Sequence, residues 1–326
     1  MTSIANPLTN AQSAVFLSYV AYSTDASKDI STYLPGWKVV WNGTQTNDGN
    51  YAFIAVDPTG ETYALAIRGS LNPDEIFKNW DAFANWILED LDVITQVSWP
   101  YASTPNPLIA SGTNTAFTNV QTMVDTMGSG LSIADYLITN VIKTGKQVII
   151  TGHSLGANIA NVYTSYFVTT VTQQNLSASN ISLYTFAAPA AGNADFAKDL
   201  DAKLPAAWHY QNSNDIIPNF PVSQTIIKTA FMYQPKPDAS AVTVSYNGYT
   251  VSLREGFILL AGVFLFYGYQ QQSNNYTTFY TELDPAYENN TAADWFGQAA
   301  SQHHLNNYGA FLGVNVPKGA SAAETV

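Results

Sequence analysis

A glycine-flanked serine is the feature of this sequence best suited to covalent chemistry. Residues 152–156 are Gly-His-Ser-Leu-Gly; they follow an apolar stretch, 147–151, and precede a helical pattern, 155–168. A strand–turn–helix of this kind holds the serine in a strained backbone conformation, and the glycine on each side prevents side-chain clashes. The turn also places the Leu155 N–H at a helix N-terminus, where developing negative charge is stabilised. The pattern therefore predicts Ser154 as a nucleophile.

A serine hydroxyl is a weak nucleophile and needs a base, and the chain has four histidines. His153 lies inside the predicted turn, where a packing role is the expectation. His209 lies in a predicted strand, where a core or surface role is expected. His303 and His304 follow a helical stretch near the C-terminus. Either of the last two fits the chain order serine, acid, histidine, so the residues alone leave the base open between them.

An acid is expected between the serine and these histidines. Asp215 lies in Asn-Ser-Asn-Asp-Ile-Ile-Pro, residues 212–218, just beyond a predicted strand. Catalytic groups gather at the carboxyl ends of strands in open α/β sheets, which favours Asp215. Asp195, Asp199 and Asp201 lie in a predicted helix together with two lysines, and a solvated helix face explains them equally well.

The composition indicates a globular protein with a large core. The chain has 326 residues, of which 46% are hydrophobic and 11% charged, and this excludes a disordered chain. The net charge of −12 makes nucleic acid and anionic membranes poor partners. The absence of cysteine excludes disulfides, thiolate metal sites and thiol catalysis. Since the sequence also lacks a P-loop, a dinucleotide fingerprint and calcium-loop spacing, no cofactor and no metal are expected.

Strand and helix patterns alternate through the middle of the chain, which predicts a mostly parallel central sheet with helices on both faces. We expect one α/β domain over 1–326. Thr9 and Gln12 have capping-box spacing before a first helix, and Pro73 opens an amphipathic helix that reaches Leu88. Strands are expected at 37–41, 51–56, 62–67, 147–151, 181–186 and 208–211.

Residues 221–300 differ in pattern from the rest. Asn247-Gly248 between two alternating stretches predicts a hairpin with a type I′ turn. The apolar run 256–269 is shorter than the ~20 residues that a membrane span needs, so we expect a helical cap over the active site, with a remote core helix as the alternative. The tail 317–326 is expected to be loose. The N-terminus shows no secretory signal as it stands, as in a mature chain from which the signal has been removed.

Six segments, taken in order, resemble the class 3 lipases, the fungal-lipase-like branch of the α/β-hydrolase fold. The likeness extends from about Thr9 to Tyr308, with an extra stretch before the last motif. The matching segments are Ala-Ile-Arg-Gly-Ser at 66–70, Asn-Trp and Asp-Leu within 85–91, the strand and turn at 146–156, Thr-Phe-Ala-Ala-Pro-Ala-Ala-Gly-Asn at 185–193, Asn-Asp-Ile-Ile-Pro at 214–218, and His304 with Tyr308 four residues on.

Carried over residue by residue, the resemblance implies Ser154 as nucleophile, Asp215 as acid and His304 as base. It also implies an oxyanion hole made by Ser70 and the Leu155 N–H, and a lid over about 71–91. The stretch between Asp215 and His304 is longer than the family's usual spacing, so the role of the extra segment, about 221–300, does not carry over.

The resemblance implies a serine carboxylester hydrolase, first a triacylglycerol lipase in lipid degradation that acts on acylglycerols at a lipid–water interface. An esterase on smaller or aromatic esters, such as feruloyl esters, is the alternative, and a non-catalytic lipase-like scaffold is the third reading. Secretion is expected, with the cytoplasm as the alternative. The sequence leaves oligomeric state, regioselectivity and chain-length preference open.

Overall fold

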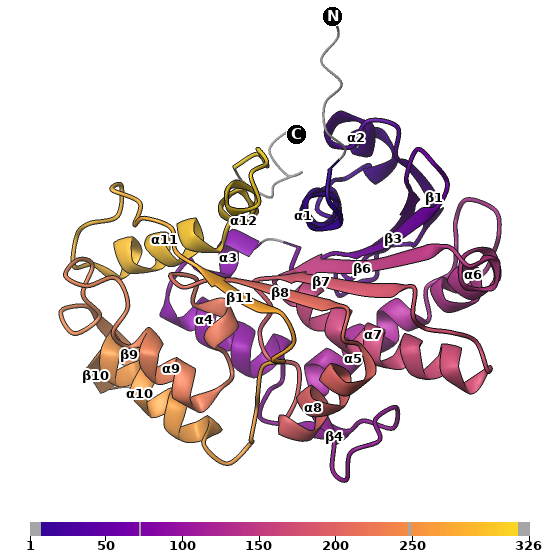
Figure 1. Ribbon diagram of the computed structural model, residues 1–326. Helices are drawn as coiled ribbons and strands as arrows, with labels where there is room; N and C mark the ends of the chain where they lie inside the picture. Colours follow the sequence, from indigo (N-terminus) through magenta and orange to yellow (C-terminus); the bar gives the residue numbers. More distant parts are fainter. Residues whose placement is uncertain (1–7, 72, 247–248, 319–326) are drawn as a thin grey trace, which may run out of the picture.

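A seven-stranded sheet forms the centre of the part of the chain that this computed structural model describes, residues 8–71, 73–246 and 249–318 (Figure 1). The strand order is β1-β2-β3-β6-β7-β8-β11. The first three strands are antiparallel neighbours, and those from β3 to β11 pair in parallel. The strands span Lys38–Asn42 (β1), Ala52–Val56 (β2), Thr62–Ile67 (β3), Gln147–His153 (β6), Ile181–Phe186 (β7), Ala207–Asn212 (β8) and Tyr276–Phe279 (β11).

The central strand β6 shows why the sheet is covered on both sides. Val148 and Ile150 belong to the apolar cluster on one face, whereas Ile149 between them belongs to the cluster on the other. Successive side chains of a strand point to opposite faces, so a strand that is apolar at every position must be buried on both. This confirms the predicted mostly parallel sheet with helices on both faces.

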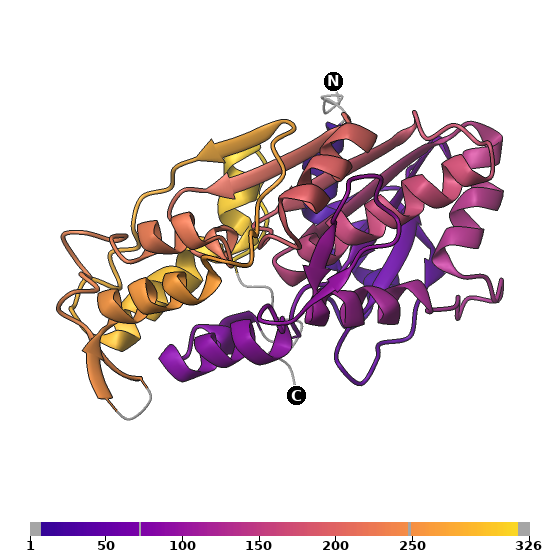
Figure 2. The ribbon, with the colours of Figure 1, turned by 90° about the horizontal axis from the view of Figure 1, so that it is seen from below.

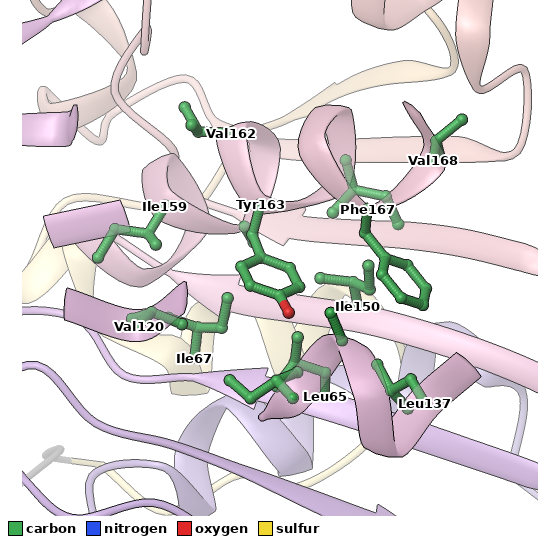
Figure 3. Packing of buried hydrophobic residues seen from close by; sticks show 14 of the residues in the cluster. Leu65, Ile67, Val120, Leu137, Ile150, Ile159, Val162, Tyr163, Phe167 and Val168 are labelled. Atoms are coloured by element: carbon green, nitrogen blue, oxygen red, sulfur yellow. The ribbon is translucent and has the colours of Figure 1, made fainter. Parts of the chain in front are cut away.

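The larger of these clusters lies under α7. Figure 3 shows Tyr163 and Phe167 of α7 directed toward the sheet, where Leu65 and Ile150 lie. This packing fixes α7, and with it the turn at its N-terminus. The helices on this face are α5 (Ser111–Gln121), α6 (Ile133–Asn140), α7 (Leu155–Gln173) and α8 (Ala194–Lys203), with the short helix η2 (Ile142–Thr144) and the ribbon β4 (Gln96–Ser98) and β5 (Leu108–Ala110).

The opposite face of the sheet is covered by both ends of the chain (Figure 1). There α1 (Asn10–Val20) packs against β6 and against α12 (Leu305–Phe311), beside α2 (Ala26–Tyr33). Thr9 is the N-cap of α1, and both hydrogen bonds of the predicted capping box with Gln12 are present.

A third apolar cluster lies beside the sheet rather than on it (Figure 2). It joins the segment after β3 to the segment that precedes and follows β11. Its elements are α3 (Pro73–Ile76), α4 (Trp80–Asn85), the π-helix η1 (Trp86–Asp90), η3 (Ile217–Asn219), α9 (Ser223–Thr229), α10 (Leu253–Phe264) and α11 (Ala292–His303).

The expectation of one helix from Pro73 to Leu88 is wrong. Asn79 interrupts it with an extended backbone, and its side-chain oxygen accepts a 2.9 Å hydrogen bond from the Ala82 N–H. Asparagine caps helix N-termini in this way, so the segment restarts as α4 instead of continuing α3. Two helical segments therefore replace one long helix in the predicted lid: α3, and α4 continued directly by the π-helix η1.

The segment 221–300, for which a cap was predicted, contains a hairpin and a strand of the main sheet. The hairpin β9 (Thr243–Tyr246) and β10 (Tyr249–Ser252) is antiparallel, as predicted; its turn, Asn247-Gly248, lies outside the described residues, as does most of the tail 317–326. In the same segment β11 adds an edge strand to the main sheet.

The apolar run 256–269 forms most of α10. Its inner side chains, Phe257, Leu260 and Phe264, are buried in the third cluster, whereas Ile258 and Leu259 are exposed on its outer side. The inner face packs against the ring of Trp80 in α4, so α10 lies directly against the predicted lid. Along the described chain, no helix combines the length and the apolar character that crossing a membrane requires.

Candidate active site

The serine turn predicted from the sequence joins β6 to α7. Ser154 has φ 59° and ψ −129°, and α7 begins at the next residue. A Cβ on Gly152 would overlap the backbone of Gly156, and a Cβ on Gly156 would overlap the Ile67 carbonyl oxygen at the end of β3. The turn is therefore packed backbone against backbone, and both glycines are required because a Cβ at either position would overlap neighbouring backbone atoms.

Ser154, His303 and Asp215 form a continuous hydrogen-bonded chain. His303 Nδ1 lies 2.8 Å from Asp215 Oδ2, and His303 Nε2 lies 2.9 Å from Ser154 Oγ. A carboxylate can only accept, so Nδ1 carries the proton and Nε2 accepts from the serine hydroxyl. All three side chains are buried, which strengthens these electrostatic interactions.

The structure corrects the prediction that His304 contacts Ser154 and Asp215; the neighbouring His303 does so. His303 is the last residue of α11, whereas His304 has φ −64° and ψ 140° and leaves the helix. The change of backbone direction sends the two side chains apart, and His304 Nε2 lies 3.0 Å from Asp74 Oδ1. Since no sequence pattern marks the last residue of a helix to within one position, the spacing to Tyr308 could not make this distinction.

Tyr308, which carried the choice of His304, does lie at the site. Its hydroxyl donates a 2.7 Å hydrogen bond to Asp215 Oδ2, and the Ile217 N–H donates to Asp215 Oδ1 at 2.9 Å. Burial and the nearby Asp215 charge raise the pKa of Tyr308 well above its usual range, so its hydroxyl keeps the proton that it donates. Asp215 is thus held by three donors, with His303 as the third.

The other candidate acids lie elsewhere. Asp199 pairs with Lys203 at 2.7 Å, and the Asn106 N–H donates to Asp195. Asp201 accepts hydrogen bonds from Ser273. None of these described contacts reaches Ser154.

The two residues expected to form an oxyanion hole, Ser70 and Leu155, line one cavity of about 740 Å³. Ser70 follows β3, which approaches the turn so closely because Gly156 has no side chain. The Ser70 hydroxyl is buried and has no hydrogen-bond partner within the described chain. The rest of the lining is mixed in polarity: Asp48, Asn50, Leu71, Glu75, Ile76, Ala82, Trp86, Glu89, Asp92, Gly112, Thr115, Ala116 and Asn119.

The predicted lid segment covers the hydrogen-bonded chain. The ring of Phe77 stands edge-on to the His303 ring, with 5.4 Å between centroids. Asp74 of α3 reaches His304, and this hydrogen bond lowers the pKa of the Asp74 carboxyl. Ser154 itself has no exposed surface, so a substrate can reach its hydroxyl only if neighbouring atoms move.

His153 has a contact that the sequence did not suggest. A packing role was expected, but its Nε2 lies 2.9 Å from the His303 carbonyl oxygen and its Nδ1 lies 3.0 Å from the Tyr22 hydroxyl. Burial lowers the pKa of His153 well below its usual value. His209 lies in β8 against Thr185, in the core role expected for it.

The arrangement fits nucleophilic acyl transfer. A serine hydroxyl bonded to an imidazole, itself oriented by a buried carboxylate, can lose its proton as it attacks a carbonyl carbon. A helix N-terminus beside the serine suits the negative charge that develops on the carbonyl oxygen. Within the described ranges no group of three histidine, aspartate or glutamate side chains is arranged to hold a metal ion.

Comparisons with known proteins identify a matching family model and solved structures that share the fold. Residues 64–225 match the family model described as lipase (class 3). The chain is similar to the crystal structure of M37 lipase at 21% identity and a TM-score of 0.76, over 95% of this chain and 96% of that one. It is also similar, at a TM-score of 0.50, to a triacylglycerol lipase whose catalytic centre is a serine protease triad (22% identity; 65% and 73% covered) and to lipase II from Rhizopus niveus (18%; 65% and 74%). At these identities the structural likeness shows a shared fold.

Proposed function

We propose that this chain, which belongs to the class 3 lipases through residues 64–225, hydrolyses carboxylic esters with Ser154, His303 and Asp215. The family supports a carboxylic ester hydrolase in general. The observation that carries the residue assignment is the unbroken hydrogen-bonded chain from Ser154 Oγ through both nitrogens of His303 to Asp215.

In the proposed reaction Ser154 Oγ attacks the ester carbonyl carbon while its proton passes to His303 Nε2. The tetrahedral intermediate collapses, and the alcohol leaves with that proton. A water molecule then attacks the acyl-enzyme while His303 accepts its proton, and the acid is released as His303 passes that proton to Ser154 Oγ. Asp215 orients the imidazole and offsets its positive charge at both steps.

Ser70 and the Leu155 N–H are proposed to stabilise the oxyanion. Both line the same cavity, and the Ser70 hydroxyl is a buried donor without a partner among the described residues. A donor left unsatisfied in the covered state is available for negative charge that develops later.

Acylglycerols are the first proposed substrates, and the cover supports this. The inner side chains of the lid, Ile76, Phe77, Trp80 and Phe83, are buried and apolar. When the lid moves, these side chains lose their packing, and a lipid–water interface would cover them at lower cost than water. Lid opening at such an interface is part of this proposal.

The cavity lining favours the alternative substrate class. The cavity that Ser70 and Leu155 line is also lined by Asp48, Asn50 and Asn119, and polar groups are poor neighbours for a long acyl chain. An esterase on smaller or aromatic esters fits this lining better. The complete Ser154–His303–Asp215 chain counts against a non-catalytic scaffold. Secretion and a role in lipid degradation stay predictions.

Hydrolysis of p-nitrophenyl esters from two to eighteen carbons, with a triolein emulsion alongside, separates the two substrate classes. A lipase should turn over triolein and the longer esters, and an esterase only the shorter ones. Ser154→Ala should abolish both turnover and fluorophosphonate labelling and keep the wild-type melting temperature, with a loss in kcat of about 10⁴–10⁶. Substantial activity in purified Ser154→Ala protein would overturn the assignment.

A further inference from the structure

We propose that Tyr22 and His153 are positioning residues that hold the proposed base His303 in register with Ser154. The inference rests on the proposed function. It starts from a second chain of hydrogen bonds that meets the first at His303: Tyr22 Oη lies 3.0 Å from His153 Nδ1, and His153 Nε2 lies 2.9 Å from the His303 carbonyl oxygen.

The direction of each hydrogen bond follows from the acceptors. A backbone carbonyl oxygen can only accept, so His153 Nε2 carries a proton and donates it to His303. A neutral imidazole then has its lone pair on Nδ1, which accepts from the Tyr22 hydroxyl. Burial disfavours the charged form of His153, and this keeps the ring in the one tautomer that suits both partners.

The His303 carbonyl oxygen needs a hydrogen-bond donor from outside its helix. His303 is the last residue of α11, and the last four carbonyls of a helix find no N–H donor within that helix. The His153 N–H satisfies this buried oxygen, while the two imidazole rings lie in contact with 4.5 Å between centroids. His153, in the turn that carries Ser154, therefore holds the end of α11 through two contacts: a hydrogen bond to the His303 backbone carbonyl and packing against the His303 ring.

The Tyr22 hydroxyl also lies beside the segment that leads from the end of β3 to Ser70 of the proposed oxyanion hole. A Cβ on Gly69 would overlap the Tyr22 hydroxyl, so that hydroxyl lies directly against the residue before Ser70. It is buried, just beyond the end of α1. One hydroxyl therefore touches the strand end that leads to Ser70 and the histidine that holds His303.

Positioning matters here because His303 must accept from Ser154 Oγ and then donate to a leaving alcohol without losing Asp215. A misplacement of about 1 Å costs on the order of 100-fold in such reactions. A neutral His153 also adds no positive charge beside the imidazolium that forms on His303.

The chain offers a matched control in a second buried histidine. His209 Nδ1 lies 2.6 Å from the Thr185 hydroxyl, and both side chains are buried. None of the described contacts of this pair reaches Ser154, His303 or Asp215. Tyr22→Phe and Thr185→Val each remove one buried hydroxyl from the Nδ1 of a histidine, but only the first removes it from the chain that ends at His303.

The test measures kcat and KM on a soluble short-chain p-nitrophenyl ester, together with the melting temperature, for Tyr22→Phe, His153→Phe, His153→Gln and Thr185→Val. We expect Tyr22→Phe and His153→Phe to lower kcat by about ten- to a hundred-fold with KM unchanged, and Thr185→Val to keep kcat. His153→Gln should recover most of kcat, because its amide N–H can still donate to the His303 carbonyl.

Two results would overturn the inference. One is a kcat for Tyr22→Phe equal to that of Thr185→Val. The other is a His153→Gln protein no more active than His153→Phe when both melt at the same temperature, since that pattern describes packing alone. Failure of the proposed function is a different result, because it appears as a wild-type protein without esterase activity or as an active Ser154→Ala variant.

Discussion

The two halves of the active site are built in different ways. The half that carries Ser154 and Ser70 is held by sheet pairing and by backbone contacts at Gly152 and Gly156 that leave no room for a side chain. The half that covers it consists of short helices held by side-chain packing in the third apolar cluster (Figure 2). Polar links between the halves include His303 with Ser154 and Asp74 with His304.

Because of this difference, we expect one half to hold Ser154 rigidly and the other half to control access to it. Parallel strands and the buried helix α7 hold Ser154, the proposed nucleophile, so we expect it to stay in place whether or not the site is covered. The short helices α3 and α4 share no strand ladder with the sheet, so their motion breaks side-chain contacts and few backbone hydrogen bonds. Regions with few such bonds open at the lowest free energy. We therefore expect substitutions in the two halves to have different effects.

The largest expected effect compares adjacent histidines. His303→Ala should lower kcat by about 10⁴, because the proposed base is lost. His304→Ala should change kcat only a few-fold, since His304 contacts the lid residue Asp74. The measurement is kcat of both purified variants at pH 8. If His304→Ala were inactive and His303→Ala active, the base would be His304, as the sequence resemblance implied, and not His303.

The next effect compares two glycines. Gly156→Ala should destabilise the protein by roughly 3 kcal/mol or more, because the new methyl group would overlap the Ile67 carbonyl. Gly262→Ala, on the exposed side of α10 with open space around it, should stabilise by roughly 0.5–1 kcal/mol. Urea unfolding of both variants measures the difference. Equal stabilities would show that the turn is not packed as described.

A third comparison lies within the covering half. Phe264 is 1% exposed and Phe266 is 90% exposed. Phe264→Ala should cost about 3–5 kcal/mol through loss of burial, and Phe266→Ala should stay within about 0.5 kcal/mol of wild type. Thermal unfolding provides the measurement. A large loss in Phe266→Ala would mean that this side chain is covered in solution.

The smallest effect concerns the contact between Asp74 and His304. This hydrogen bond lowers the pKa of Asp74 in the covered state, so it favours the cover above the usual carboxyl pKa and is lost as pH falls through the lowered value. Asp74→Ala should therefore raise the rate of fluorophosphonate labelling at pH 7, by up to about five-fold for an exposed pair, and less at high salt.

Lys78→Ala is the control for this effect, because Lys78 pairs locally with Glu75 at 3.5 Å and does not bridge the two halves. A labelling rate in Asp74→Ala equal to that of Lys78→Ala would remove the contact from any role in access.

The sequence by itself predicted the elements of the rigid half. The apolar stretch at 147–151, the Thr9 capping box and the Gly-x-Ser-x-Gly turn are local patterns, and each forms the predicted element. Asp215 was chosen as the candidate acid because it follows a strand, and strand ends gather at one edge of a parallel sheet. These features depend on residues that are neighbours in the sequence.

Only the tertiary structure decided the other half. The choice of His303 over His304 depends on where α11 ends, the break of the lid depends on the Asn79 cap, and the contact of His153 with His303 joins residues 150 positions apart. The addition of β11 to the sheet is likewise a long-range pairing. Hydrophobic periodicity specifies which face of an element is buried, but it does not specify the partner or a single-residue register, because those are fixed by side chains that meet only when the chain is folded.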